Sequence, residues 1–223
     1  MIRRTLLIAS ALVMLLGLAV IDAQAATIWT DWESASTSGS ATGTLGGVGV
    51  SYAGEVAGSI INGTSNIWAP DSSFTGGTVT TSPSVVKDDI RLDGAAGTNT
   101  LTFSAPVQNP VFAIWSLGQP GLAASFNFDA TPTLQAGGPN SIFNGGPITV
   151  LGNVVSGNEG NGVVQFSGTF SSISWTDTPE HFYAFTVGMN GPLGPPTAVP
   201  EPATLILLGS GLTGLAWRLR KRR

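Results

Sequence analysis

The chain of 223 residues has no cysteine and only one histidine. The absence of cysteine excludes a disulfide framework and a thiolate metal site, so the fold has to be stabilised by buried apolar surface. Cations are also scarce away from the ends of the chain. Residues 26–199 contain two, Lys87 and Arg91, against eleven acidic residues, which gives this region a formal charge of −9. A region with that charge repels nucleic acid, so DNA and RNA are excluded as partners.

Long helical patterns are missing as well, because Gly, Ser, Thr and Asn recur too densely for an apolar stripe of period 3.6 to develop. Apolar and polar residues alternate instead, as in residues 100–103, 125–128 and 172–176. Such alternation predicts half-buried strands. Residues 111–117 are continuously apolar between Pro110 and Gly118, which predicts a central strand covered on both faces.

Turn signals separate about ten such segments, which is typical of a sandwich. The expected strands lie at 27–32, 48–53, 77–81, 100–103, 111–117, 125–128, 147–151, 162–166, 170–176 and 181–187. We therefore predict an all-β fold for residues 26–190, an antiparallel two-sheet sandwich of jelly-roll type. The last two strands are expected to pair as a closing hairpin through the turn at Pro179. The Ser- and Gly-rich residues 34–47 are expected to form a loop or a strand edge.

Residues 1–25 have the three parts of a secretory signal peptide. Arg3 and Arg4 form the charged start, residues 6–20 are apolar, and Ala23 and Ala25 provide the small residues before a cut that leaves Ala26 first. The wider twin-arginine motif is absent, which favours the general secretory machinery. The sequence thus predicts an exported protein whose signal helix is removed.

A second apolar segment ends the chain. Residues 191–199 form a Gly- and Pro-rich linker, and the apolar residues 203–217 are followed by a basic cluster within 218–223. Fifteen helical residues span about 22 Å, short of a hydrocarbon core of about 30 Å, so this predicted transmembrane helix is a marginal anchor. The cluster is a stop-transfer signal that stays cytoplasmic, and its residues are Arg218, Arg220, Lys221, Arg222 and Arg223.

The order of features in the tail is distinctive. Val199, Pro200, Glu201 and Pro202 precede the short apolar span, and the Arg-rich terminus follows it. Residues 200–223 thereby resemble the PEP-CTERM sorting signal of Gram-negative bacteria. The resemblance implies processing by exosortase, a membrane-embedded transpeptidase, and a transient membrane anchor. It also implies an association with exopolysaccharide and biofilm, with a final location in the periplasm, on the cell surface or in the extracellular matrix.

Acidic side chains suggest two candidate cation sites. Asp88, Asp89 and Asp93 form the densest acidic group and could supply oxygen ligands to a structural Ca²⁺, although Lys87 and Arg91 beside them favour a solvated strand edge instead. A second candidate lies within residues 177–181, where an exposed polar turn is the favoured alternative. No cofactor other than that Ca²⁺ is expected.

The tryptophans are numerous, and flat indole faces can hold sugar rings. Trp115 and Trp175 fall on inward-facing strand positions and are expected in the core. Trp68 lies near a turn and is expected to be exposed, which makes it the first candidate for a ligand contact, with Trp32 second.

Three functions remain open at this point. The leading one is a non-catalytic surface or matrix protein, because the sequence is organised around sorting at both ends. A carbohydrate-binding module using Trp68 is the second. A polysaccharide hydrolase is the third: His181 has no nucleophile motif near it, but eleven acidic residues could include a catalytic pair.

Overall fold

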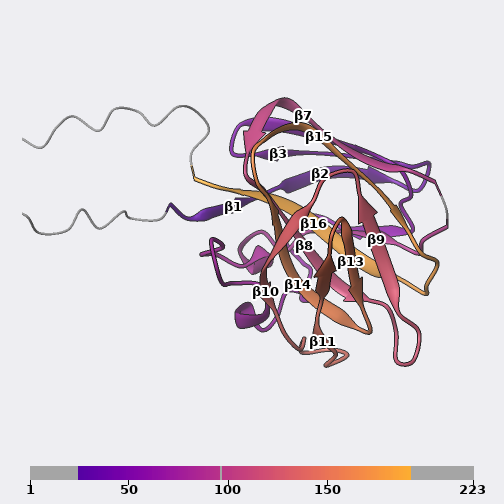
Figure 1. Cartoon of the computed structure of the whole chain (residues 1–223). Helices are drawn as coiled ribbons and strands as arrows, with labels where there is room; N and C mark the ends of the chain where they lie inside the picture. Colours follow the sequence, from indigo (N-terminus) through magenta and orange to yellow (C-terminus); the bar gives the residue numbers. More distant parts are fainter. Residues whose placement is uncertain (1–24, 96, 192–223) are drawn as a thin grey trace, which may run out of the picture.

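The computed structural model of the chain describes residues 25–95 and 97–191. These residues form sixteen strands and two short 3₁₀ helices, arranged in two layers (Figure 1). The expected signal helix and the expected C-terminal helix lie outside the described residues. Within the described part, no helix is long and apolar enough to cross a membrane.

Each layer is an eight-stranded sheet, and nearly all of the strand pairs are antiparallel. The first sheet contains β1 (Thr27–Trp29), β5 (Gly58–Ile60), β6 (Asp89–Leu92), β8 (Pro110–Leu117), β10 (Pro132–Gly137), β11 (Gly146–Pro147), β14 (Gly160–Phe166) and β16 (Tyr183–Asn190). The second sheet contains β2 (Asp31–Ser36), β3 (Ser40–Leu45), β4 (Val48–Ala53), β7 (Asn99–Gln108), β9 (Ala124–Phe128), β12 (Thr149–Leu151), β13 (Val154–Gly157) and β15 (Thr169–Asp177). The short β11 is the exception, because it pairs with β14 in parallel.

The chain repeatedly crosses from one sheet to the other. The order β6-β16-β8-β14 in the first sheet faces the order β7-β15-β9-β13 in the second. This alternation is the connectivity of a jelly roll, so the predicted all-β sandwich is confirmed. The predicted closing hairpin is wrong, because β15 pairs with β7 and β9 whereas β16 pairs with β8, β6 and β1. Two strands that are adjacent in sequence here belong to different layers.

Residues 34–47 were expected to form a loop or a strand edge, and the structure shows the strand edge: β2 and β3 form a hairpin at the edge of the second sheet. One further strand prediction needs correction. Residues 77–81 are not a strand; they contain a tight turn closed by an isolated bridge between Gly76 and Val79. Local composition pointed the other way at 77–81, since Val and Thr favour strands.

The main core lies between the sheets and is rich in aromatic side chains. Phe112 of β8 stacks on Phe185 of β16 with ring centroids 5.0 Å apart, and it meets Trp175 of β15 edge-on at 5.1 Å. The contact with Trp175 joins the two layers directly. Trp175 is buried, as is Trp115 on the other face of β8, which confirms that both tryptophans belong to the interior.

The first sheet is buried on both faces. Every residue of β8 is buried, which confirms the central strand expected at 111–117. The segment between β5 and β6, residues 61–88, covers the outer face and brings a second apolar cluster with it. It contains η1 (Asp71–Ser73) and η2 (Pro83–Val85). We call residues 61–88 the cover.

The two ends of the described chain lie together (Figure 1). β1 pairs with the end of β16, and Thr27 Oγ1 donates a hydrogen bond of 2.8 Å to Asn190 Oδ1. A Cβ on Gly191 would lie 3.5 Å from that of Ala25. The predicted cleavage position and the start of the predicted linker are therefore neighbours at one end of the sandwich, the terminal end.

Candidate functional site

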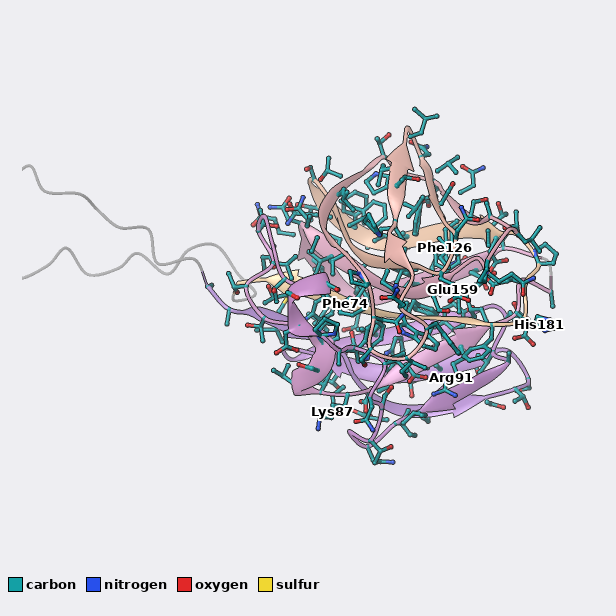
Figure 2. The ribbon with its side chains drawn as sticks, turned by 90° about the horizontal axis from the view of Figure 1, so that it is seen from below. Phe74, Lys87, Arg91, Phe126, Glu159 and His181 are labelled. Carbon is teal, nitrogen blue, oxygen red and sulfur yellow. The ribbon has the colours of Figure 1, made fainter. Side chains whose placement is uncertain are left out.

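The end of the sandwich opposite the termini carries five of the eleven acidic residues of the domain. The strand registers bring together the loops that follow β4, β6, β13 and β15 at this end. Figure 2 shows Glu159 and His181 on the side away from the chain ends. We call this region the acidic end, and its carboxylates belong to Glu55, Asp93, Glu159, Asp177 and Glu180.

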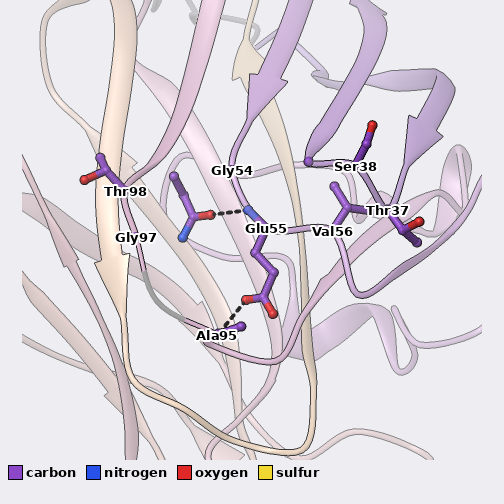
Figure 3. A pocket seen from close by; sticks show the side chains of 10 residues that line it. Thr37, Ser38, Gly54, Glu55, Val56, Ala95, Gly97 and Thr98 are labelled. Atoms are coloured by element: carbon purple, nitrogen blue, oxygen red, sulfur yellow. Dashed lines mark hydrogen bonds between the residues drawn. The ribbon is translucent and has the colours of Figure 1, made fainter.

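An open pocket of about 450 Å³ lies at the acidic end between the loops that follow β2, β4 and β6. Glu55 projects into it, and one carboxylate oxygen accepts a hydrogen bond of 3.0 Å from the backbone N–H of Ala95 (Figure 3). Asn99 forms the back wall, where its Oδ1 accepts the Glu55 N–H and its Nδ2 donates to Asp177 Oδ2. The rest of the lining is Thr, Ser, Gly, Val and Ala. Such a pocket can hold a small polar or cationic group.

Burial and mutual repulsion perturb the carboxylates of this end. Burial raises the pKa of Glu180 to about 7, and the negative charges of Glu159 and Asp93 raise it further, whereas the Gly118 N–H that donates 2.6 Å to Oε2 opposes the rise. Burial together with Glu55 also raises the pKa values of Asp93 and Asp177. Asp93, Asp177 and Glu180 therefore bind protons more tightly than isolated carboxylates would.

The turn at residues 177–181 is not a cation site. The carboxylate of Asp177 is bound by Asn99 and that of Glu180 by the Gly118 N–H, while the exposed His181 lies with Asp93 and Arg91 around a separate pocket of about 250 Å³. Among residues 25–95 and 97–191, no three His, Cys, Asp or Glu side chains are placed to hold a metal ion. The polar-turn interpretation fits this arrangement better.

Asp88, Asp89 and Asp93 are not among any group of acidic side chains placed to hold a metal ion in the described part of the chain, so the expected calcium site is wrong. The solvated strand edge is wrong as well, since Asp88 and Asp89 are both 0 % exposed. Asp88 accepts the backbone N–H groups of Trp32 and Gly63 at 3.0 and 2.7 Å. These two acidic residues fasten the cover to the sheets.

Asp89 is neutralised locally. Its Oδ1 accepts from Arg91 Nε at 2.9 Å, and its Oδ2 accepts from the hydroxyl of Ser65. β6 lies inside the first sheet between β16 and β5, so its carboxylates face protein groups rather than solvent. The sequence could not reveal this, because the strand partners come from distant parts of the chain.

The expected exposure of Trp68 is also wrong. Its side chain is 1 % exposed: the ring meets Phe74 edge-on at 5.3 Å, and Nε1 donates 2.9 Å to the carbonyl oxygen of Asp88. Trp32 is equally buried, with Nε1 donating to Thr186 Oγ1 and the ring against Phe185. Neither indole offers a free face on which a sugar ring could stack.

Sequence reasoning missed Glu55, Asn99 and Glu159. Glu159 accepts the hydroxyl of Ser116, and its own N–H binds the carbonyl of Gly118, so it holds the end of β8 from the β13–β14 turn. That turn was recognisable from Gly157 and Gly160. Its nearness to Glu180, however, follows from the sheet order alone.

The fold and this charge distribution define an all-β domain whose two ends emerge side by side. The comparison with family models identifies the tail that follows it: residues 198–222 match the PEP-CTERM protein-sorting motif. The comparisons with curated proteins and with solved structures find no match for the chain.

The chain therefore carries a PEP-CTERM sorting signal, which confirms the resemblance read from the tail. It is an exported protein that exosortase sorts, first as a membrane-anchored precursor and then outside the cell. The match includes the predicted sorting residues 199–202 and most of the basic cluster, all of which lie outside the described residues. The cleavage after Ala25 stays a prediction.

Proposed function

We propose that this chain is a non-catalytic surface or matrix protein that associates with exopolysaccharide after its tail has been processed. The observation that carries the proposal is the sorting motif at residues 198–222. A protein released outside the cell by that route meets the polymers of the cell surface. A stable sandwich without a need for disulfides is suited to remain there.

The position of the termini supports this role. Because β1 begins where β16 ends, the tail and the mature N-terminus leave from the terminal end. A precursor held by its tail then presents the acidic end away from the membrane. Bacterial inner-membrane surfaces are generally anionic, so repulsion favours the same orientation.

The state of the carboxylates supports a non-catalytic role. A glycosidase needs two carboxyl groups free to reach a sugar bond, one as acid and the other as base or nucleophile. Glu159 and Glu180 lie near enough for the charge of Glu159 to raise the pKa of Glu180, and each already binds a group at the end of β8. His181 has no hydrogen bond to a Ser or Thr hydroxyl among the described residues, so a nucleophile–base pair has no support either.

Sorting and matrix association can be tested in one experiment. The full chain is expressed in an exopolysaccharide-producing Gram-negative host with and without its exosortase, and an antibody to the sandwich follows the product. We expect a shortened product in the extracellular matrix of the first strain and a full-length product in the membranes of the second. Deleting exopolysaccharide synthesis should move the shortened product from the matrix into the medium.

The matched control replaces Pro200, Glu201 and Pro202 together by Ala, and it should behave in the complete host as the wild type does without exosortase. Full-length protein that is soluble inside the cells would refute export. A shortened product that stays in the matrix without exopolysaccharide would refute the polysaccharide association while leaving the sorting intact.

A further inference from the structure

A second pocket, of about 290 Å³, opens on the cover of the first sheet, away from the acidic end. Its walls come from three separate stretches of chain: residues 65–69, residues 84–87 and Ser141 of the β10–β11 loop. Its volume is at the lower end of the range for small-molecule sites, about 300–1,000 Å³. We call it the Lys87 pocket.

The walls of the Lys87 pocket are tied to one another by backbone hydrogen bonds. The N–H of Ser65 donates 2.7 Å to the carbonyl of Lys87, and the N–H of Ser141 donates 2.9 Å to the carbonyl of Ala69. Trp68 lies at the pocket and is fixed by its bond to the Asp88 carbonyl. The pocket is therefore formed before any ligand arrives, which lowers the entropic cost of binding.

Lys87 gives this pocket the one Lys or Arg side chain of the described residues that has no ion-pair partner. Only two cations occur among residues 25–95 and 97–191, and Arg91 is committed to Asp89 and to the ring of Phe182. Lys87 is exposed, lies at the periphery of the molecule in Figure 2, and has no ion-pair partner in the described part of the chain. In a domain with so many carboxylates, this is where an anion is attracted.

The backbone at Lys87 is unusual. Its φ is 60°, in the left-handed region that residues other than Gly, Asn and Asp seldom adopt. The bond of its N–H to the Pro83 carbonyl and that of its carbonyl to Ser65 hold it there. Such strained positions occur preferentially at ligand-binding sites.

The remaining groups define the ligand. The side chains of Asn66 and Ser141 have no hydrogen-bond partner among the described residues and add an amide and a hydroxyl to the ammonium group. Ser84 already donates a hydrogen bond of 2.7 Å to Asp71, whose negative charge is therefore close to the pocket lining and disfavours a multiply charged anion. One cation, two neutral polar groups and the small apolar contact of Ala69 match a sugar ring that carries one carboxylate.

We propose that the Lys87 pocket binds a uronate residue of an acidic polysaccharide. The proposal rests on the proposed function, which places the protein among exopolysaccharides, and it names the sugar class and the residues that select it. The ammonium group of Lys87 pairs with the uronate carboxylate, while Asn66 and Ser141 hydrogen-bond to the ring hydroxyls.

The test is calorimetric titration of the full chain, purified in nonionic detergent, with tetragalacturonate and with a neutral glucose tetrasaccharide. We expect the acidic oligosaccharide to bind and Lys87→Gln to weaken its binding at least about tenfold, as loss of a charge-assisted contact does. Lys87→Arg should retain most of the affinity. Asn66→Ala and Ser141→Ala should each weaken binding by a smaller factor.

The control Ser172→Asp adds a negative charge on the outer face of the second sheet, and so changes the net charge as Lys87→Gln does. It should leave the affinity unchanged, and equal melting temperatures of the variants exclude misfolding. Three results would each refute the uronate site: the wild type does not bind tetragalacturonate, it binds the neutral tetrasaccharide equally well, or Lys87→Gln binds tetragalacturonate as tightly as the wild type does.

The location of the wild-type protein in cells separates this proposal from the proposed function. If one of these results is found and the protein still remains in the polysaccharide matrix, only the pocket assignment fails. If the protein is also absent from the matrix, both proposals fail.

Discussion

The outer faces of the two sheets differ: one is apolar and covered, and the other is polar and exposed to solvent. The outer face of the first sheet is sealed by the cover, whose Trp68 and Phe74 pack over apolar residues of β8, β14 and β16. The outer face of the second sheet is open and carries hydroxyl groups in register across neighbouring strands: Ser34, Thr42, Ser51, Thr102 and Ser172. The strands show this difference directly, since β14 is buried throughout whereas β7 and β15 alternate.

This difference between the two outer faces explains why the molecule has a third layer, the cover, over the first sheet alone. A sheet with both faces apolar requires a covering segment, and that segment creates pockets between its own turns. A sheet with one hydroxyl-rich face is satisfied by solvent and stays smooth. The Lys87 pocket accordingly lies on the covered side, although hydroxyl groups are denser on the open side.

The largest expected effect comes from opening the cover. Trp68→Ala should lower the free energy of unfolding by about 3–5 kcal/mol, because it leaves a cavity over the first sheet and orphans the Asp88 carbonyl. Urea denaturation of the full chain in nonionic detergent measures the change. Trp175→Ala in the main core should cost a similar amount. A loss below about 1 kcal/mol for Trp68→Ala would mean that the cover is not packed as described.

Removing the fastening of the cover should have the next largest effect. Asp88→Ala leaves the N–H groups of Trp32 and Gly63 without their acceptor, which should cost about 2–4 kcal/mol. The same denaturation assay applies, with Asp129→Ala as the control because Asp129 is exposed beside the open sheet. Equal losses in the two variants would show that the fastening contributes nothing specific.

Glu180 should make the stability of the fold depend on pH. It lies in the connection between β15 and β16, where the chain passes from the open sheet to the covered one. The pKa of Glu180 is raised to about 7 in the folded state, so the folded form binds a proton more tightly than the unfolded chain does. Stability should therefore fall as the pH rises from about 4.5 to about 7, by about 1–2 kcal/mol for this partly solvated group.

Glu180→Gln keeps an oxygen for the Gly118 N–H and removes the charge. Melting temperatures measured between pH 4 and pH 8 should therefore fall less with rising pH in this variant than in the wild type, and the variant should be the more stable at pH 8. Identical pH profiles would assign the dependence to other carboxylates of the acidic end.

The smallest effect is expected on the open face. Thr102→Val replaces one exposed hydroxyl in the middle of β7 by a methyl group and should change the free energy of unfolding by no more than about 0.5 kcal/mol. The same substitution type on the covered sheet, Thr186→Val in β16, should cost more because its hydroxyl accepts the buried indole N–H of Trp32. Large losses at both positions would indicate that the open face is covered in solution.

The sequence by itself was sufficient for features that depend on neighbouring residues. Leu101 and Phe103, and likewise Ile173 and Trp175, alternate with polar residues, which predicted strands with one buried face. The apolar run at 111–117 predicted a strand buried on both faces. The sequence of the tail predicted that the protein is sorted. Each of these signals is written in consecutive residues, because side chains alternate along a strand and a sorting signal is read as a linear segment.

Only the tertiary structure decided which strands pair and what the polar residues do. The jelly-roll connectivity places β15 and β16 in different sheets. The cover buries Trp68, which its position near a turn predicted to be exposed. The same cover makes Asp88 and Asp89 buried hydrogen-bond acceptors instead of surface carboxylates. Among the residues that the structure describes, it also leaves Lys87 as the cation without an ion-pair partner, beside a formed pocket. The physical reason is that strand pairing and the packing of the cover bring together residues that are far apart in the chain. A local sequence pattern does not show which distant segment a strand or a side chain will contact.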